Sequence, residues 1–317
     1  MIKKQSTRLG VGLAMSLSTM PVWAQDGPIM PQLLDTAECY LSLEVDNAVD
    51  WRGPYGRGYE VFDPSLSFEV ALITVRHEGR ACDFFLTATG QNGGGEGRLD
   101  GQGYALIYDL LRDPNGPSIL SPDLFGNQLS RLHGTFAEGP SAQQFMIYLS
   151  IPPEQFVPGG TYSGQAILKL FRDDMAAPEL SVQEALPITV PVASALKVEN
   201  LQAGVGRRDL SVDLGNLETG ATSELDFVLS SNAPVQARIS SDNLGFLAHQ
   251  FGARPIPYRM SIGNRRLDLS NGSDQVAIGT GGERGLDLPL RVMVDQQPGA
   301  AAGKYSDIVT INFRVEQ

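Results

Sequence analysis

Two stretches of the chain share one pattern of alternating apolar and polar side chains. Residues 303–317 read GKYSDIVTINFRVEQ, and residues 160–171 read GTYSGQAILKLF. The apolar face of the later stretch comprises Tyr305, Val309, Ile311 and Phe313, and that of the earlier one Tyr162, Ala166, Leu168 and Leu170. A period of two residues is typical of a half-buried β-strand. Each stretch therefore predicts a strand, and their similarity predicts two related units in one chain.

Similar alternation recurs at regular spacing along the rest of the chain. The chain of 317 residues contains 35 Gly and 20 Pro, which favours many turns over long helices. The predicted strands are 39–45, 67–77, 82–89, 104–110, 145–151, 161–171 and 186–192, then 210–214, 223–229, 235–240, 258–262, 286–294 and 305–315. This spacing predicts an all-β fold of two immunoglobulin-like β-sandwich domains, at 25–193 and 194–317.

The first 24 residues have the features of a secretory signal peptide. Lys3, Lys4 and Arg8 precede an apolar run over residues 9–20, and Val22-Trp23-Ala24 offers small-residue spacing for cleavage. The alternative is an N-terminal membrane anchor, but about 12 apolar residues cannot cross a hydrocarbon core of about 30 Å. We therefore expect an exported protein.

Charge and cysteine content narrow the possible partners further. The formal net charge of −12 disfavours nucleic acid and anionic lipid. An oxidising compartment would join the two cysteines, Cys39 and Cys82, in a disulfide, although two buried free thiols are the alternative. No CxxC pair is present and the three histidines are scattered, so we expect no metal site and no cofactor.

Several of these stretches together resemble a known family. YALIYDLLRD from Tyr104, IPPEQFVPGGTYSG from Ile151 and the closing AAGKYSDIVTINF are similar to the spore coat protein U domain. That family includes subunits of archaic chaperone–usher pili. The resemblance implies an incomplete immunoglobulin-like fold, whose last strand comes from a periplasmic chaperone or from the N-terminal extension of an adjacent pilin subunit.

The two units differ in the residues that come after the shared strand. Residues 186–192 can complete the first domain within the chain, and Pro187 and Pro191 on their outward face indicate an edge strand. Only Glu316 and Gln317 come after Val315, so we expect the second domain to lack its final strand. A strand from another molecule would then enter a groove lined by Tyr305, Val309, Ile311 and Phe313.

The mature N-terminus bears on the position of the subunit in a fibre. Residues 25–38 show no sustained alternation, so the chain is expected to receive a strand but not to donate one. We therefore predict a non-enzymatic tip adhesin at the cell surface that is delivered by a chaperone and an outer-membrane usher and promotes attachment and biofilm formation. The alternatives are a structural subunit of the same pilus and an exported carbohydrate-binding or hydrolytic β-sandwich protein.

Two loops of the first domain carry candidate contacts for an unknown host or abiotic surface. The candidates are Trp51, Tyr55, Tyr59 and Phe62 in the first loop, and Ile119, Leu120, Leu124 and Phe125 in the second. The alternative is that these side chains fold back and cap the sandwich. No catalytic group is expected, because the carboxylates are dispersed and Ser163 and Ser306 lack a GxSxG motif.

Overall fold

The computed structural model describes residues 38–46, 48–123, 125, 128–174, 177–200 and 209–316. The predicted signal peptide, residues 1–24, lies outside them. The described chain folds into β-strands with two single-turn 3₁₀ helices, so the all-β, sandwich-like fold is confirmed. Within these residues, no helix has both the length and the apolar character needed to span a membrane.

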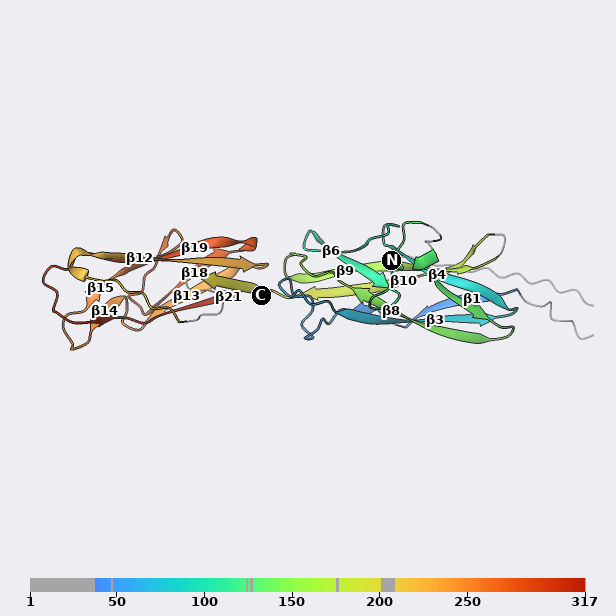
Figure 1. Cartoon of the computed structure of the whole chain (residues 1–317), viewed down its shortest axis with the longest axis horizontal. Coiled ribbons are helices and arrows are strands. Elements are labelled where there is room, and N and C mark those ends of the chain that lie inside the picture. The colour runs from blue at the N-terminus through green and yellow to red at the C-terminus, as the bar shows by residue number, and fades with distance from the viewer. Residues whose placement is uncertain are drawn as a thin grey trace, which may run out of the picture. The chain divides into compact units, whose positions relative to one another are not determined.

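The N-terminal half of the described chain comprises ten strands, β1 to β10, and the 3₁₀ helix η1 (Figure 1). The bounds are β1 Tyr40–Val45, β2 Val49–Asp50, β3 Phe68–Glu78, β4 Cys82–Gly90, β5 Gly97–Gly101, β6 Tyr104–Leu111, η1 Gln128–Ser130, β7 Leu132–Phe136, β8 Ser141–Ser150, β9 Gly160–Arg172 and β10 Glu179–Val192.

These strands pair in the order β1-β3-β8-β6-β5-β9-β10-β2, and β4 joins β9 to β7. Alternate side chains of β6, β8, β9 and β10 meet in one hydrophobic core. Strand β10 pairs antiparallel with β9 along its whole length, from Glu179↔Arg172 to Val192↔Gly160. The prediction that 186–192 joins the first unit is therefore confirmed, and Pro187 and Pro191 are exposed as expected of outward positions.

The described residues of the C-terminal half form eleven strands and one 3₁₀ helix. The bounds are β11 Leu196–Asn200, η2 Leu217–Thr219, β12 Ala221–Ser231, β13 Val235–Ser241, β14 Phe246–His249, β15 Ile256–Pro257, β16 Arg259–Ile262, β17 Arg265–Arg266, β18 Ser273–Gly279, β19 Gly282–Val294, β20 Tyr305–Ser306 and β21 Val309–Val315. They form sheets in the orders β11-β12-β19-β16-β17, β18-β13-β21 and β15-β14-β20. Their buried side chains form a second hydrophobic core.

Two strand predictions in this half are wrong. Residues 210–214 form no strand, because no described segment pairs with them. The single strand predicted at 305–315 is divided into β20 and β21, with Asp307 and Ile308 between them. The proposed domain limits at residues 193 and 194 stay a prediction.

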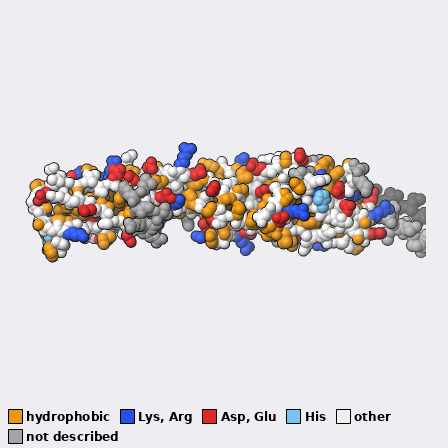
Figure 2. Space-filling model, in the orientation of Figure 1, with side chains coloured by type: hydrophobic (Ala, Val, Ile, Leu, Met, Phe, Trp, Pro, Cys, Tyr) orange, Lys and Arg blue, Asp and Glu red, His pale blue; other side chains and the backbone are white. Residues whose placement is uncertain are grey.

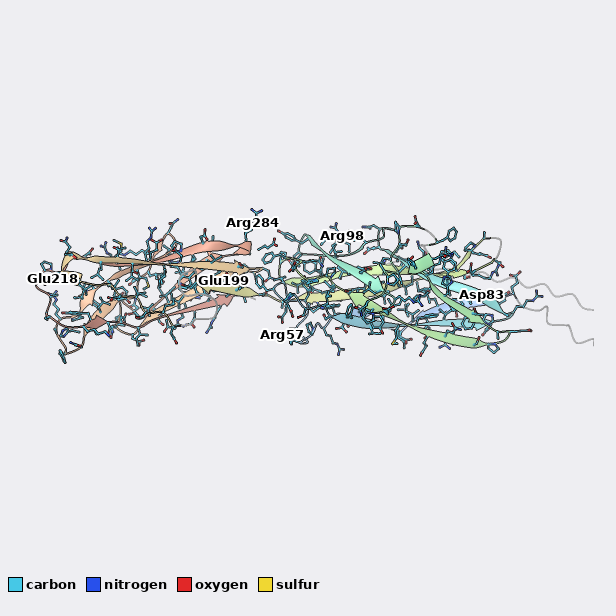
Figure 3. All side chains as sticks on the ribbon, in the orientation of Figure 1. Arg57, Asp83, Arg98, Glu199, Glu218 and Arg284 are labelled. Carbon is cyan, nitrogen blue, oxygen red and sulfur yellow. A yellow bond between two sulfur atoms is a disulfide. The ribbon has the colours of Figure 1, made fainter. Side chains whose placement is uncertain are left out.

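A disulfide joins Cys39, just before β1, to Cys82 at the start of β4, with the Cα atoms 6.2 Å apart. The predicted pairing is therefore confirmed. The bond lies at the end of the N-terminal half that carries Asp83, and the opposite end carries Arg57 (Figure 3). It ties the first described strand to the sheet that contains β9 and β10.

Replacing both cysteines by serine should lower the free energy of unfolding by about 4 kcal/mol, because the bond closes a long loop in the unfolded chain. The two cysteines are 43 residues apart in sequence. Denaturant unfolding of the oxidised protein and of the double variant measures the difference. Adding reductant to the double variant is the control, and an unchanged midpoint between the two proteins would contradict the expectation.

Candidate functional site

Strand β21 has one paired edge and one free edge. It pairs antiparallel with β13 over all seven residues, from Val235↔Val315 to Ser241↔Val309. Among the described residues, β13 is its only strand partner. The backbone groups that point away from β13, here called the free edge of β21, are therefore available to another strand.

The inward face of β21 is incompletely covered. Val309, Ile311, Phe313 and Val315 are half-buried and alternate with exposed Thr310, Asn312 and Arg314. All four inward side chains pack against the core, and the ring of Phe313 lies 6.4 Å from that of Phe227 on β12. Phe227 is itself half-buried. An apolar face remains partly exposed here along the whole free edge.

The corresponding strand of the N-terminal half has no such exposed face. Strand β9 carries Tyr162, Ala166, Leu168 and Leu170, all with fully buried side chains. Strand β10 covers one edge of β9 and adds Leu186, Ile188 and Val190 to the core. On the other edge β9 pairs with β4. Among the described residues, β9 therefore has a strand neighbour on both edges, whereas β21 has one on a single edge.

Asp307 bonds the start of β21 to the neighbouring turns. Its Oδ2 accepts hydrogen bonds from Ser241 Oγ and Tyr258 Oη, both at 2.6 Å. Its Oδ1 accepts from the backbone N–H groups of Asn243 at 3.0 Å and Ile308 at 2.8 Å. Burial first, and then the bond to Asp307, raise the pKa of Tyr258. At the break between β20 and β21, these bonds to the Asp307 carboxylate hold the chain where it has no strand pairing.

The first copy of the motif could not hold such a carboxylate. Gly164 occupies the position that Asp307 has in the second copy. A Cβ at Gly164 would lie 2.8 Å from the carbonyl oxygen of Arg98, since β5 crosses closely there. Sequence reasoning missed the role of Asp307. The Gly-to-Asp difference between the two copies was the available signal.

Tyr305 lies apart from the other residues predicted to line the groove. It belongs to β20, opposite His249 of β14, and the two rings are 4.7 Å apart. Its side chain contacts the C-terminal core but does not continue the face of β21. The structure therefore brings together Val309, Ile311 and Phe313 and separates Tyr305 from them. A role of any of these residues in strand binding stays a prediction.

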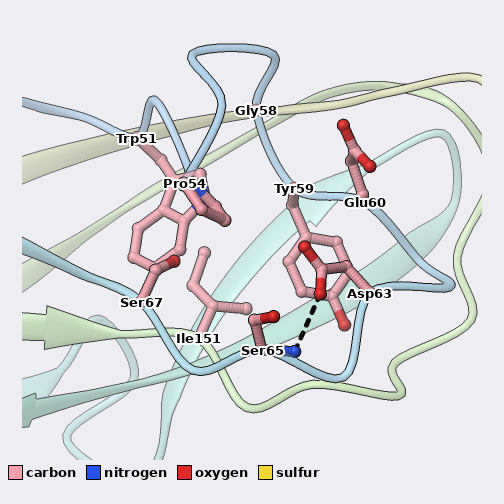
Figure 4. A pocket seen from close by; sticks show the side chains of 9 residues that line it. All are labelled: Trp51, Pro54, Gly58, Tyr59, Glu60, Asp63, Ser65, Ser67 and Ile151. Carbon is pink, nitrogen blue, oxygen red and sulfur yellow. Dashed lines mark hydrogen bonds between the residues drawn. The ribbon is translucent and has the colours of Figure 1, made fainter.

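The first predicted contact loop directs two of its four candidate side chains inward, and these two, Trp51 and Tyr59, line a small pocket (Figure 4). Trp51 and Tyr59 are buried in the N-terminal core, whereas Tyr55 and Phe62 are exposed. Gly53, at φ +68°, allows the loop to close, because a Cβ there would lie 2.2 Å from the carbonyl oxygen of Gly58. Trp51 and Tyr59 therefore follow the alternative to surface contact, in which the loop side chains fold back into the sandwich.

The cavity beneath this loop is small. Trp51, Tyr59, Asp63 and Ser65 are among its lining residues, and its volume is about 10 Å³. That is about the space of one water molecule. A hydrogen bond from the Ser65 side chain, followed by the 2.9 Å bond from the Ser65 N–H, lowers the pKa of the Asp63 carboxyl. The cavity cannot hold a sugar.

In the second predicted contact loop, two of the three described candidate residues lie inside. Ile119 and Leu120 are buried, and backbone bonds between residues 119–121 and Ala88 attach the loop to β4. Leu124 lies outside the described residues. Phe125 is exposed at 37% and packs on Phe171, with ring centroids 5.4 Å apart. Surface contact by Tyr55, Phe62 or Phe125 stays a prediction.

The two loops lie on different parts of the N-terminal half. The first is bonded through Tyr59 to Pro191 and Ala193 at the end of β10, which is paired there with the start of β9. Phe125 of the second loop contacts Phe171 near the opposite end of β9. The structure therefore does not combine the candidate residues into one surface.

A potential metal-ligand group among the described residues combines Cys39, His77 and Cys82, whose ligand atoms lie within 4.8 Å of one another. The two sulfur atoms are bonded to each other. The ring nitrogens of buried His77 face the carbonyl oxygens of Gly139 and Arg80 at 2.9 and 2.7 Å. In this oxidised state the group binds the turn after β3 to that after β7.

Comparisons with known proteins found likenesses in structure but not in sequence. No family model and no curated protein matches the chain. Among solved structures, a chain of the chaperone–tip adhesion subunit complex of the archaic Csu pili of Acinetobacter baumannii aligns at 12% identity and TM-score 0.43, over 87% of this chain and 99% of that one.

Two further structures cover the same share of this chain, 87%. They are the CupB6 tip adhesin of Pseudomonas aeruginosa, at 14% identity, 93% of that chain and TM-score 0.37, and CfaE, the adhesive subunit of CFA/I fimbria of enterotoxigenic Escherichia coli, at 13%, 82% and 0.36. With TM-scores below 0.5, these likenesses do not establish the function of this chain, which we infer from its own residues.

Tyr258 should make the protein sensitive to alkali. Its folded-state pKa is raised, so the stabilisation is fully present below the unfolded value of about 10 and is lost as pH rises above it. We expect the melting temperature to fall more steeply above pH 10 in the wild type than in Tyr258→Phe. Tyr55→Phe, at an exposed position, is the matched control. Identical pH profiles of the wild type and Tyr258→Phe would contradict this role.

Proposed function

We propose that the C-terminal half binds a β-strand of another polypeptide along the free edge of β21. The observation that carries the proposal is the half-buried row of Val309, Ile311, Phe313 and Val315 beside that edge. An added strand would pair its backbone with β21 and cover this row with its own apolar side chains. In the N-terminal half, β10 has the same relation to β9.

This mode of assembly is that of chaperone–usher pili, as the similarity to spore coat protein U domains implies. We propose that a periplasmic chaperone first covers the free edge of β21, and that an adjacent pilin subunit replaces it at an outer-membrane usher. The protein is then a non-enzymatic adhesin at the tip of the pilus, exported to the cell surface. Attachment and biofilm formation are the functions that such a position serves.

The N-terminal half supports the division of roles within this proposal. It contains a complete core, a disulfide and an in-chain neighbour for β9, so it needs no partner to satisfy its strands. Its exposed apolar side chains include Tyr55, Phe62 and Phe125. We propose that this half contacts the host or abiotic surface, while the C-terminal half connects the protein to the fibre.

A charge on the inward face of β21 should prevent strand capture. Ile311→Asp or Phe313→Asp would place a carboxylate against the core, where an unpaired charge is costly. We expect loss of co-purification with the chaperone when both are produced in the periplasm. Thr310→Asp, at an exposed outward position, is the matched control and should retain capture. A wild-type protein that stays soluble, monomeric and heat-stable without any partner would contradict the proposed function.

The position in the fibre can be tested separately. Immunogold labelling of purified pili with an antibody against the N-terminal half should place gold at fibre ends, with one labelled end for each fibre. An antibody against the major subunit serves as the control for the shaft. Gold distributed along the shaft would favour the alternative, a structural subunit of the same pilus.

A further inference from the structure

The outer face of the sheet that contains β3 and β8 is apolar at one end. Val70 on β3 is 51% exposed, and Met146 on β8 is 56% exposed. An antiparallel sheet with one face on a core commonly presents polar side chains on the other. We call six outward side chains of this face the β3–β8 patch: Phe68, Val70, Leu72, Leu111, Met146 and Tyr148. Exposed apolar side chains that lie together are typical of interaction sites.

Strand pairing places the patch residues side by side. Val70 is opposite Tyr148 on β8, and Tyr148 is opposite Leu111 on β6. Leu72 is opposite Met146 in the next row of the same face. Opposite residues of paired strands have Cβ atoms about 4.5–5.5 Å apart. These five side chains therefore form one continuous surface across three neighbouring strands.

The patch does not serve the N-terminal core. Ala71, Ile147 and Leu110 alternate with patch residues along the same three strands, and they are buried in that core. Successive side chains of a strand point to opposite faces, so the patch residues point away from the core. Phe68, two residues before Val70, extends the outward row and is half-buried.

The same face becomes polar beyond Leu72. The next outward residue of β3 is Thr74, which is opposite Glu44 on β1 and Gln144 on β8. Arg76 follows, and its Nη2 donates to Glu44 Oε2 at 2.8 Å. The apolar side chains are therefore confined to one end of the face, and the basic side chain beyond them is already paired.

Carboxylates border the patch on two sides. Asp46, just after β1, donates its N–H to the carbonyl oxygen of Leu72 at 3.4 Å, and its side chain is exposed. Asp109 on β6 lies two residues before Leu111, on the same face, and accepts a hydrogen bond from the hydroxyl of Ser118. A cation beside an apolar ligand would therefore meet negative charge at the border of the patch.

The N-terminal half is also much more acidic than the C-terminal half. Residues 38–193 contain 20 acidic and nine basic side chains, whereas residues 194–317 contain 14 and 12. Figure 2 shows acidic and basic side chains scattered among hydrophobic ones on the face of the protein that it draws. An excess of negative charge favours approach to cationic surfaces over anionic ones.

We propose that the β3–β8 patch binds an apolar solid surface that carries cationic groups such as amines. The inference rests on the proposed function and deepens it, because it names the chemistry of the surface that the N-terminal half contacts. Compact ligands bind in concave sites, whereas the face of a sheet suits an extended surface. A second copy of the chain fits less well, since six side chains offer far less than the about 800 Å² per partner of a stable interface.

Oxidative footprinting of the full-length chain tests the contact. The protein, purified with its chaperone or alone if none is captured, is bound to amine-bearing polystyrene beads and treated briefly with hydroxyl radicals. Exposed methionine is converted to the sulfoxide. We expect oxidation of Met146 to fall severalfold on binding, while Met293, exposed at 41% in the C-terminal half, is the matched control and stays unchanged. Unchanged oxidation of Met146, or equal protection of both methionines, overturns the proposal.

Three kinds of bead with the same polystyrene core test the chemistry of the surface. Retention of the wild type should be greatest on amine-bearing beads, lower on plain beads and lowest on carboxylated beads. Equal retention on all three, or the reverse order, overturns the proposal. Absence of retention on every bead overturns the adhesive contact as well. Chaperone capture, measured on the same protein, reports separately on the free edge of β21.

Substitutions that preserve charge separate the patch from the charge of the whole protein. In the double variant Val70→Thr, Met146→Gln, apparent affinity for amine-bearing beads should fall at least about tenfold, because the apolar contact is lost. The matched control is Leu180→Thr, Met293→Gln, at two exposed apolar positions on other strands, and its affinity should change less than about twofold. Equal losses in both double variants would contradict a role of the patch.

The carboxylate at the border has its own test. Asp46→Asn should lower apparent affinity for amine-bearing beads about two- to fivefold and leave retention on plain beads unchanged, because one exposed charge pair is lost. Asp242→Asn, at an exposed position of the C-terminal half, is the matched control. The same loss in both variants would show that total charge, and not the border of the patch, selects the cationic surface, and would overturn the proposal.

Discussion

The constraint on which the rest of this structure depends is that the strand shared by the two halves, β9 and β21, requires a hydrogen-bonding neighbour on each edge if its backbone groups are all to be paired and its inward face fully covered. In the N-terminal half β9 meets this requirement with β4 on one side and β10 on the other. In the C-terminal half β21 meets it only on the side of β13, within the described chain. The burial of the inward side chains of β21 depends on backbone pairing, because a strand that paired with its free edge would also cover these side chains.

Much of the fold could be predicted from alternation of apolar and polar residues. The strands at β3, β4, β6, β9 and β10 have clear patterns, and a chain with two cysteines allows one intramolecular pairing. Residues 210–214 alternate equally well but form no strand. Alternation shows which face of a segment is apolar. A strand also requires a neighbouring strand to pair with, and the local sequence does not reveal whether one is present.

The candidate site could be predicted only in part for a similar reason. The face of Val309, Ile311 and Phe313 can be read from the period of two, but the break at Asp307 depends on Ser241 and Tyr258, far away in sequence. The inward direction of Trp51 and Ile119 was equally hidden, since a loop has no period from which a face could be read. Contacts between distant segments decide both cases.

The pairing of β10 with β9 also has a consequence for the order of events during synthesis. A chain is made from its N-terminus, and domains commonly fold as they emerge. Every strand of the N-terminal core has been synthesised once Val192 is made, before any of β11 to β21 exists. The N-terminal half can thus reach its final pairing while the rest of the chain is still being extended. The free edge of β21 can be exposed to other chains only after β21 has been synthesised, when the N-terminal half is already complete.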